Sequence, residues 1–135
     1  MDPFSLTVGI VGLIGAVKAC LKLAGKSVGP SKIGKAELAD TNSTLYEALG
    51  VLQSFKTFLK LHDDDDGRLQ TLIHLGPVID RCQQALQCIK TFMQDTSTLE
   101  KIWKGAKFDK AYRNAITAVG ESSKLFKMAV MADQQ

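Results

Sequence analysis

The sequence predicts an all-α protein, an up-and-down helical bundle of four to five helices that forms a single domain over residues 1–135. Apolar residues recur at helical spacing along the chain, and no segment shows the sustained alternation of a half-buried strand. The apolar fraction of 45% and the charged fraction of 23% are those of a soluble globular domain with a sizeable core. Long periodic segments joined by short connections favour an antiparallel bundle.

The first helix is expected to start at Asp2 and Pro3, which suit an N-cap and a first helical turn, and to reach about Lys26. Residues 4–17 carry no charge. This uncharged run falls short of the roughly 20 residues of a permanent membrane span. Lysines follow the run instead of preceding it, so a secretory signal peptide is a poor fit.

Glycines and lysines give this first helix an unusual pattern. A glycine inside a helix costs roughly 1 kcal/mol relative to alanine, so several glycines within two turns require a reason. Three recur at every third position, namely Gly9, Gly12 and Gly15. They leave a smooth face that another helix or lipid can approach closely. Three lysines then follow at four-residue spacing on one helix face, Lys18, Lys22 and Lys26.

The second helix is expected to start at a cap on Ser31 and to end at the acidic run 63–66, which is followed by Gly67. Its apolar face is formed by Leu45, Leu49, Leu52, Phe55 and Leu59. A third helical pattern follows, with apolar positions on both sides of Pro77. Because proline cannot donate a backbone hydrogen bond, we expect a kink or a new helix start there. The apolar positions are Leu69, Leu72, Ile73, Val78, Ile79, Cys82, Leu86, Ile89 and Met93.

The last part of the chain is expected to form one or two helices. Ser97 and Glu100 have the spacing of a capping box, which predicts a helix start. Gly105 is expected to interrupt this helix before a final one begins. The final helix has its apolar positions at Tyr112, Ile116, Val119, Leu125, Phe126 and Met128.

Positive charge is concentrated at the start of the chain. Residues 1–35 contain five lysines and one aspartate and carry a net charge of +4, whereas the remaining hundred residues carry −1. A basic amphipathic segment joined to a near-neutral body favours an anionic membrane surface as partner. Basic residues are not interleaved with aromatic ones as in single-strand binders, so we expect no nucleic-acid partner.

The titratable residues show no pattern of an enzyme or of a metal site, so no catalytic residue, metal or cofactor is predicted. Cys20, Cys82 and Cys88 are odd in number and lack metal-binding spacing, which favours buried, reduced thiols in the cytoplasm. A calcium loop starting at Asp63 would place Gly67 and His74 where oxygen ligands are needed. The acidic run is therefore interpreted as a solvated loop. His62 and His74 have no partner at ligand spacing, and no phosphate-binding loop is present.

A second basic segment surrounds Trp103 and Phe108, with Lys101, Lys104, Lys107 and Lys110 at every third position. Two interpretations remain open. The lysines and aromatic side chains could form a second contact with lipid headgroups. Alternatively, the lysines form a solvated helix face while Trp103 packs into the core, and this second interpretation is favoured.

Four stretches of the sequence resemble a known family. The opening Met1–Leu6 with its glycine-spaced apolar run resembles the HeLo-like N-terminal domains of fungal NOD-like receptors and cell-death effectors. The segment Leu75–Leu86 resembles that family's proline-containing helix, and Trp103–Lys104 and Lys124–Ala129 also match its patterns. The resemblance covers nearly the whole chain.

The resemblance implies a helical bundle related to HeLo domains and to the four-helix bundle of necroptosis executioners. It also implies a cytoplasmic cell-death effector of fungal innate immunity or heterokaryon incompatibility. In that family, an amyloid motif or a NOD-like receptor partner drives self-association. The first helix then permeabilises the plasma membrane. No amyloid-like segment is present in this sequence, so the activating switch is unassigned.

Two hypotheses for function follow. In the first, residues 1–28 form a membrane-active helix, with Lys18, Lys22 and Lys26 binding anionic headgroups. The membrane-inserting residues are then Phe4, Leu6, Val8, Gly9, Ile10, Val11, Gly12, Leu13, Ile14, Gly15 and Val17. In the resting protein, this segment is expected to lie largely inside the bundle. In the alternative, the domain is a protein–protein signalling or oligomerisation module of a NOD-like receptor, with no direct membrane activity.

Overall fold

The structure, a computed structural model, describes residues 3–26, 35–61, 72–94 and 98–133 of the chain. These residues form four long helices and one short 3-10 helix: α1 (Pro3–Lys26), α2 (Lys35–Leu61), η1 (Ile73–Leu75), α4 (Gly76–Gln94) and α5 (Thr98–Asp133). No strand occurs within these ranges, which confirms the prediction of an all-α helical bundle.

Some expectations concern positions outside the described residues. These are the caps at Asp2, Ser31 and Ser97, the acidic run 63–66 with Gly67, His62 and Leu69. The side chains of Phe4, Lys26, Ile73 and residues 98–109 also lie outside the description, although their backbone is helical. The two interpretations of the segment around Trp103 therefore remain predictions.

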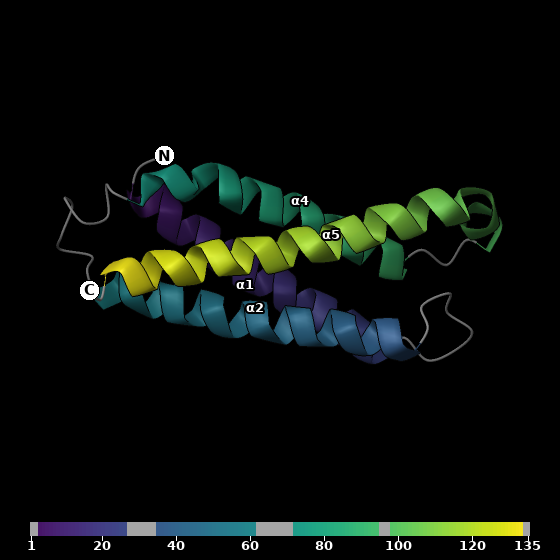
Figure 1. Cartoon of the computed structure of the whole chain (residues 1–135), viewed down its shortest axis with the longest axis horizontal. Coiled ribbons are helices and arrows are strands. Elements are labelled where there is room, and N and C mark those ends of the chain that lie inside the picture. Colours follow the sequence, from purple (N-terminus) through teal and green to yellow (C-terminus); the bar gives the residue numbers. More distant parts are fainter. Residues whose placement is uncertain (1–2, 27–34, 62–71, 95–97, 134–135) are drawn as a thin grey trace.

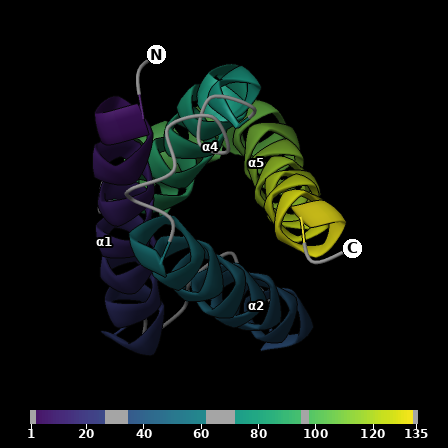
Figure 2. The same ribbon diagram turned by 90° about the vertical axis from the view of Figure 1, so that its left-hand side faces the viewer.

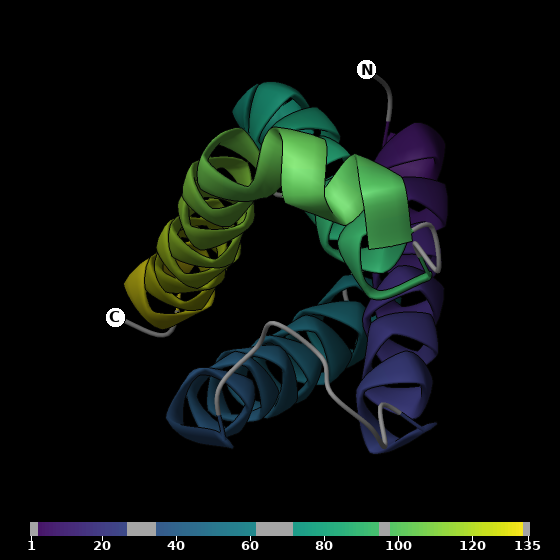
Figure 3. The same ribbon diagram turned by 90° about the vertical axis from the view of Figure 1, so that its right-hand side faces the viewer.

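The four long helices alternate in direction along the bundle, so its topology is up and down (Figure 1). α1 packs against α2 and α4, and α5 packs against the same two helices. The end-on views show that α1 therefore lies diagonally across from α5 (Figures 2 and 3). Each helix must bury an apolar stripe against two neighbours, as the helical spacing of its apolar residues requires.

Aromatic pairs join α5 to both of its neighbours. Phe126 of α5 meets Phe55 of α2 edge to face, with ring centroids 5.6 Å apart. Tyr112 stacks on Phe92 of α4 at 4.5 Å. The hydroxyl group of Tyr112 also forms a hydrogen bond with the buried Thr41 hydroxyl of α2. These contacts hold α5 between α2 and α4 at two levels of the bundle.

Pro77 lies in the first turn of α4, so of the two expected outcomes, a kink or a new helix start, the structure has the new start. A first-turn backbone nitrogen has no intrahelical partner, so a proline there loses no hydrogen bond. η1 precedes it and is closed by a hydrogen bond of 3.0 Å from the Leu75 nitrogen to the Leu72 carbonyl. Leu72 and Leu75 are both buried, so this turn tethers the start of α4 to the core.

The expected interruption at Gly105 is wrong, because α5 is one continuous helix of 36 residues. A single glycine inside a helix costs only about 1 kcal/mol, which packing along two neighbouring helices exceeds. The expected apolar face of this helix is also corrected in part. Phe126 is fully buried, but Leu125 and Met128 are exposed. Three apolar residues within four positions span too wide an arc to face the core together.

The packing of the core predicts that alanine substitutions at two neighbouring positions of α5 lower the free energy of unfolding by very different amounts. Replacing the fully buried Phe126 by alanine removes its edge contact with Phe55 and leaves a cavity. We expect Phe126→Ala to lower the free energy of unfolding by about 3–5 kcal/mol. The exposed Leu125→Ala is the control, with an expected change within about 0.5 kcal/mol. Urea unfolding followed by circular dichroism measures both, and equal losses would contradict this account of α5.

Candidate functional site

α1 has one face in the core. Its fully buried side chains are Leu6, Ile10, Leu13 and Val17, and Ile14 is nearly so. Their spacing of three and four residues places them on one side of the helix. The expectation that residues 4–17 lie largely inside the bundle is therefore correct for this face only. α1 is a surface helix because it packs against two neighbours, not a central helix surrounded on all sides.

The opposite face of α1 is exposed and, over its first half, uncharged. Val8 is 55% exposed and Val11 is 45% exposed. Glycines and lysines continue the same face, and we define the α1 outer face as Val8, Val11, Gly12, Gly15, Lys18 and Lys22, all of them exposed. Exposed valines on a surface helix leave apolar area in water, which favours a partner or a lipid surface.

The three glycines have different environments. A Cβ atom at Gly9 would lie 3.1 Å from the Ile79 side chain of α4, so an alanine there would press on Ile79. At Gly12, a Cβ atom would meet the Gln83 amide nitrogen at 3.4 Å, and at Gly15 nothing lies within 4 Å. Packing within this bundle therefore accounts for Gly9 alone. Gly12 and Gly15 weaken an exposed helix without any internal contact that requires them.

α1 also fits the dimensions of a bilayer. The segment Ser5–Gly25 is long and apolar enough to cross a membrane, by length and composition. Its 21 residues extend about 32 Å, close to the hydrocarbon thickness of about 30 Å. The uncharged run alone is shorter, so a span must include Lys18 and Lys22. A third of the candidate window is buried in the bundle, and a core helix of a soluble protein passes the same test.

The cysteines are unsuited to nucleophilic chemistry. Burial raises the pKa of the Cys20 thiol to about 11, against a smaller opposing effect of the positive charge of Lys90. Burial likewise raises the pKa of Cys82 to about 11, against a smaller opposing effect of the Ser122 hydroxyl. Burial also raises the pKa of Cys88. All three are free thiols, and at neutral pH they are protonated and weak as nucleophiles.

The described residues contain no group of three histidine, cysteine or acidic side chains placed to hold a metal ion. His74 is exposed on η1.

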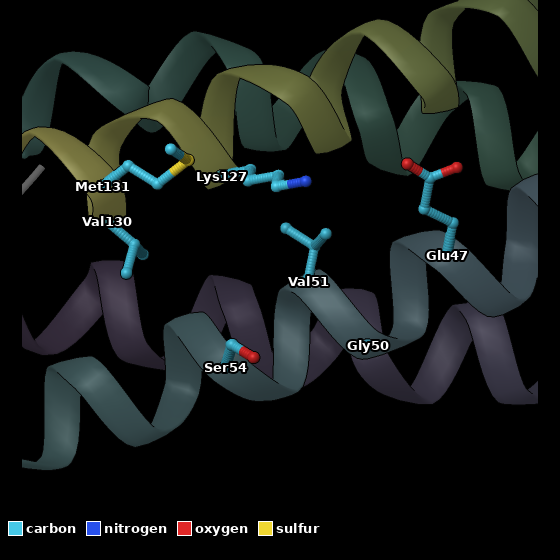
Figure 4. A pocket seen from close by; sticks show the side chains of 7 residues that line it. All are labelled: Glu47, Gly50, Val51, Ser54, Lys127, Val130 and Met131. Atoms are coloured by element: carbon cyan, nitrogen blue, oxygen red, sulfur yellow. The ribbon is translucent and has the colours of Figure 1, made fainter.

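A groove that the sequence pattern does not predict lies between α2 and α5. It has a volume of about 400 Å³ and is lined by Glu47, Gly50, Val51, Ser54, Lys127, Val130 and Met131 (Figure 4). We call it the α2/α5 groove. The spacing of its α2 residues marks one helix face, but a single sequence does not show which helix lies opposite. Met128 and Met131 of α5 are both exposed, although Met128 was expected to face the core. Methionines near the end of the last helix were therefore the signal in the sequence that could have indicated an apolar surface there.

Comparison with family models, with curated proteins and with solved structures finds no match to this chain.

The different environments of the glycines predict different effects of alanine. Gly15→Ala adds a methyl group in open space and removes the helix penalty of glycine, so we expect the free energy of unfolding to rise by about 0.5–1 kcal/mol. Gly9→Ala gains less, or destabilises the fold, because its methyl group presses on Ile79. Chemical denaturation of both variants measures the difference. Equal stabilisation would contradict the close packing of Gly9 on α4.

Proposed function

We propose that this protein is a membrane-permeabilising cell-death effector domain that acts through α1 at an anionic membrane. The observation that carries the membrane step is that α1 combines the length of a bilayer span with an apolar face already exposed on the folded bundle. The cell-death role is inferred from the resemblance to HeLo-like domains. From the same resemblance we infer a cytoplasmic resting state and self-association on activation. An amyloid-bearing or NOD-like receptor partner would supply the trigger.

First contact with lipid requires no unfolding. Val8 and Val11 are exposed, so they can enter the interface while α1 stays in the bundle. Lys18 and Lys22 lie further along the same exposed face. Long lysine side chains can keep their charge among headgroups while their stems cover apolar surface. Adsorption therefore uses only side chains that already face water.

Insertion requires α1 to leave the bundle, and its buried face sets the energetic scale. Each of the five buried side chains, Leu6, Ile10, Leu13, Ile14 and Val17, contributes about 1.5–3 kcal/mol through burial. Exposure of all five to water would cost on the order of 10 kcal/mol, more than many domains can supply. Transfer directly into hydrocarbon avoids most of this cost, because the side chains move between two apolar environments. Insertion is therefore expected only at a membrane.

The alternative is a protein–protein signalling or oligomerisation module without membrane activity. Two exposed apolar surfaces favour contact with a protein. One is the groove between α2 and α5, and the other is the α1 outer face. The two functions differ in their dependence on lipid. A module that contacts only proteins would release no vesicle contents and would not distinguish anionic from neutral lipid.

Insertion of α1 predicts a strong effect of charge at Gly12. This position is exposed, and a side chain there meets only the end of Gln83, so Gly12→Glu should fold normally. A carboxylate in hydrocarbon is unfavourable by several kcal/mol, so we expect dye release from anionic vesicles to fall by about tenfold or more. The neutral Gly12→Gln has a similar size and serves as the matched control, with the smaller loss. A folded Gly12→Glu variant with full release would rule out insertion.

Headgroup binding predicts an effect of the first-helix lysines. Each contributes about 1 kcal/mol near an anionic surface, so replacing Lys18, Lys22 and Lys26 by glutamine should weaken vesicle binding on the order of a hundredfold. Added salt should have a similar effect on the wild type, because the Debye length is roughly 10 Å at 0.1 M. Co-sedimentation with anionic vesicles measures binding.

The matched control for this charge change replaces three exposed lysines of other helices, Lys56, Lys60 and Lys124. The net charge falls equally in both triple variants. If both lose equal affinity, binding depends on total charge rather than on α1.

A further inference from the structure

The α2/α5 groove is an apolar channel with charged residues along its walls. Val51 of α2 points toward Lys127 of α5, whereas Val130 and Met131 of α5 lie further along the groove, toward Ser54 (Figure 4). Gly50 contributes no side chain, and nothing lies within 4 Å of where its Cβ atom would be. The same two helices carry two further exposed apolar side chains, Leu61 and Met128, which are 75% and 63% exposed. This combination offers a partner helix a place to bury apolar side chains.

The groove and the α1 outer face lie on opposite sides of the bundle. Gly12 of the outer face is beside Gln83 of α4, so this face belongs to the α1/α4 side. α2 and α5 form the other side, since α1 lies diagonally across from α5 (Figures 2 and 3). A contact between the two surfaces therefore needs two molecules and cannot form within one.

The two surfaces match along the bundle axis. α1 begins and α2 ends at the same end of the bundle, and the two helices run in opposite directions (Figure 1). At 1.5 Å per residue, Val8 lies about 8 Å from the start of α1, and Ser54 lies about 10 Å from the end of α2. On the same scale, Lys18 and Glu47 both lie at about 21–22 Å. If a second copy is shifted sideways without rotation, Val8 of one copy therefore lies near the level of Ser54 in the other, and Lys18 lies near the level of Glu47.

We propose that the α2/α5 groove binds the α1 outer face of a second copy of this chain, in a head-to-tail arrangement. Val8 and Val11 of one copy contact the apolar part of the groove in the other. Gly12 and Gly15 allow the α1 backbone to approach, which gives these two exposed glycines a reason. This inference goes beyond the proposed function, because it concerns the folded bundle and does not depend on membrane insertion.

Charge complementarity supports a second copy as the occupant. Lys18 meets Glu47 on the α2 wall. Asp40 precedes Glu47 by seven residues on α2 and lines a second depression between α2 and α5. It lies at about the level that Lys22 of the other copy would occupy. The α5 wall carries Lys127 and Arg113, so we assign the pairing with lysines to the α2 wall alone. An apolar end and an oppositely charged end then coincide on both surfaces.

A head-to-tail contact between different surfaces leaves one copy of each surface free at the ends of the assembly. Because repeated shifts without rotation cannot close into a ring, association continues beyond a dimer. It also covers the α1 outer face of every copy except one. Docked copies thus compete with lipid for the same face.

Two glycine variants test the arrangement. Gly15→Gln obstructs the α1 outer face, and Gly50→Gln fills the groove. Both positions are exposed and open around the Cβ atom, so both variants should fold. Gly25→Gln is the matched control, because it changes an equally open glycine of α1 beyond Lys22. Sedimentation velocity of the whole chain over a range of concentrations measures association.

We expect the wild type and Gly25→Gln to associate beyond a dimer, and each of the other two variants to remain monomeric alone. Mixed in equal amounts, those two variants should form a dimer and nothing larger, because the pair retains one intact surface of each kind. A wild type that stays monomeric at all concentrations would overturn the proposal. Dimerisation of either blocked variant alone would overturn it too, because like surfaces would then be pairing.

A charge exchange tests the register. Lys18→Glu and Glu47→Lys should each weaken association by about tenfold, because like charges then face one another. The double variant restores the opposite pair and should regain most of the affinity. No recovery in the double variant would overturn the pairing of Lys18 with Glu47.

Discussion

The period of the α-helix divides the first apolar segment into two faces, and the rest of the structure depends on this division. Leu6, Ile10 and Leu13 supply the core with the side chains against which α2 and α4 pack. Val8 and Val11 on the other side stay in water. An ordinary surface helix would have charged residues at those positions. α1 has valines there instead of charged residues. Its core face stabilises the bundle, and its outer face remains available for binding.

The position of the lysines determines how α1 can be used. Lys18 and Lys22 follow the apolar part of the outer face, so the helix has an apolar beginning and a basic end on one exposed surface. In a bilayer, this order suits an apolar beginning in the hydrocarbon and a basic end among the headgroups. Against a protein groove, the same order fixes direction, because only one orientation places the lysines beside acidic side chains.

Sequence periodicity was sufficient for the fold and for part of the site. The bundle, its antiparallel order and the helix start at Pro77 follow from local signals that tertiary packing reinforces. The continuity of α5 through Gly105 does not follow from local signals, because packing against neighbouring helices outweighs a local penalty of about 1 kcal/mol. The glycine spacing marked α1 as unusual in the sequence. Only the position of α4 shows that Gly9 packs against a neighbouring helix and that Gly15 has open space around it. The α2/α5 groove depends on the same nonlocal information.

Docking and membrane contact cannot use the same α1 outer face at once, and their energetics differ. A docked α1 keeps its buried face in the core, so assembly sacrifices none of the stabilisation from Leu6, Ile10 or Leu13. Insertion as proposed would remove that stabilisation from the bundle and replace it with contact to lipid. Docking as proposed would be reversible by dilution, because each bundle stays folded, whereas insertion would leave a three-helix remainder with its core exposed. That remainder gains a second reason to associate, because the α1-facing sides of α2 and α4 are then uncovered. The proposed insertion would thus promote association through surfaces that the folded bundle hides.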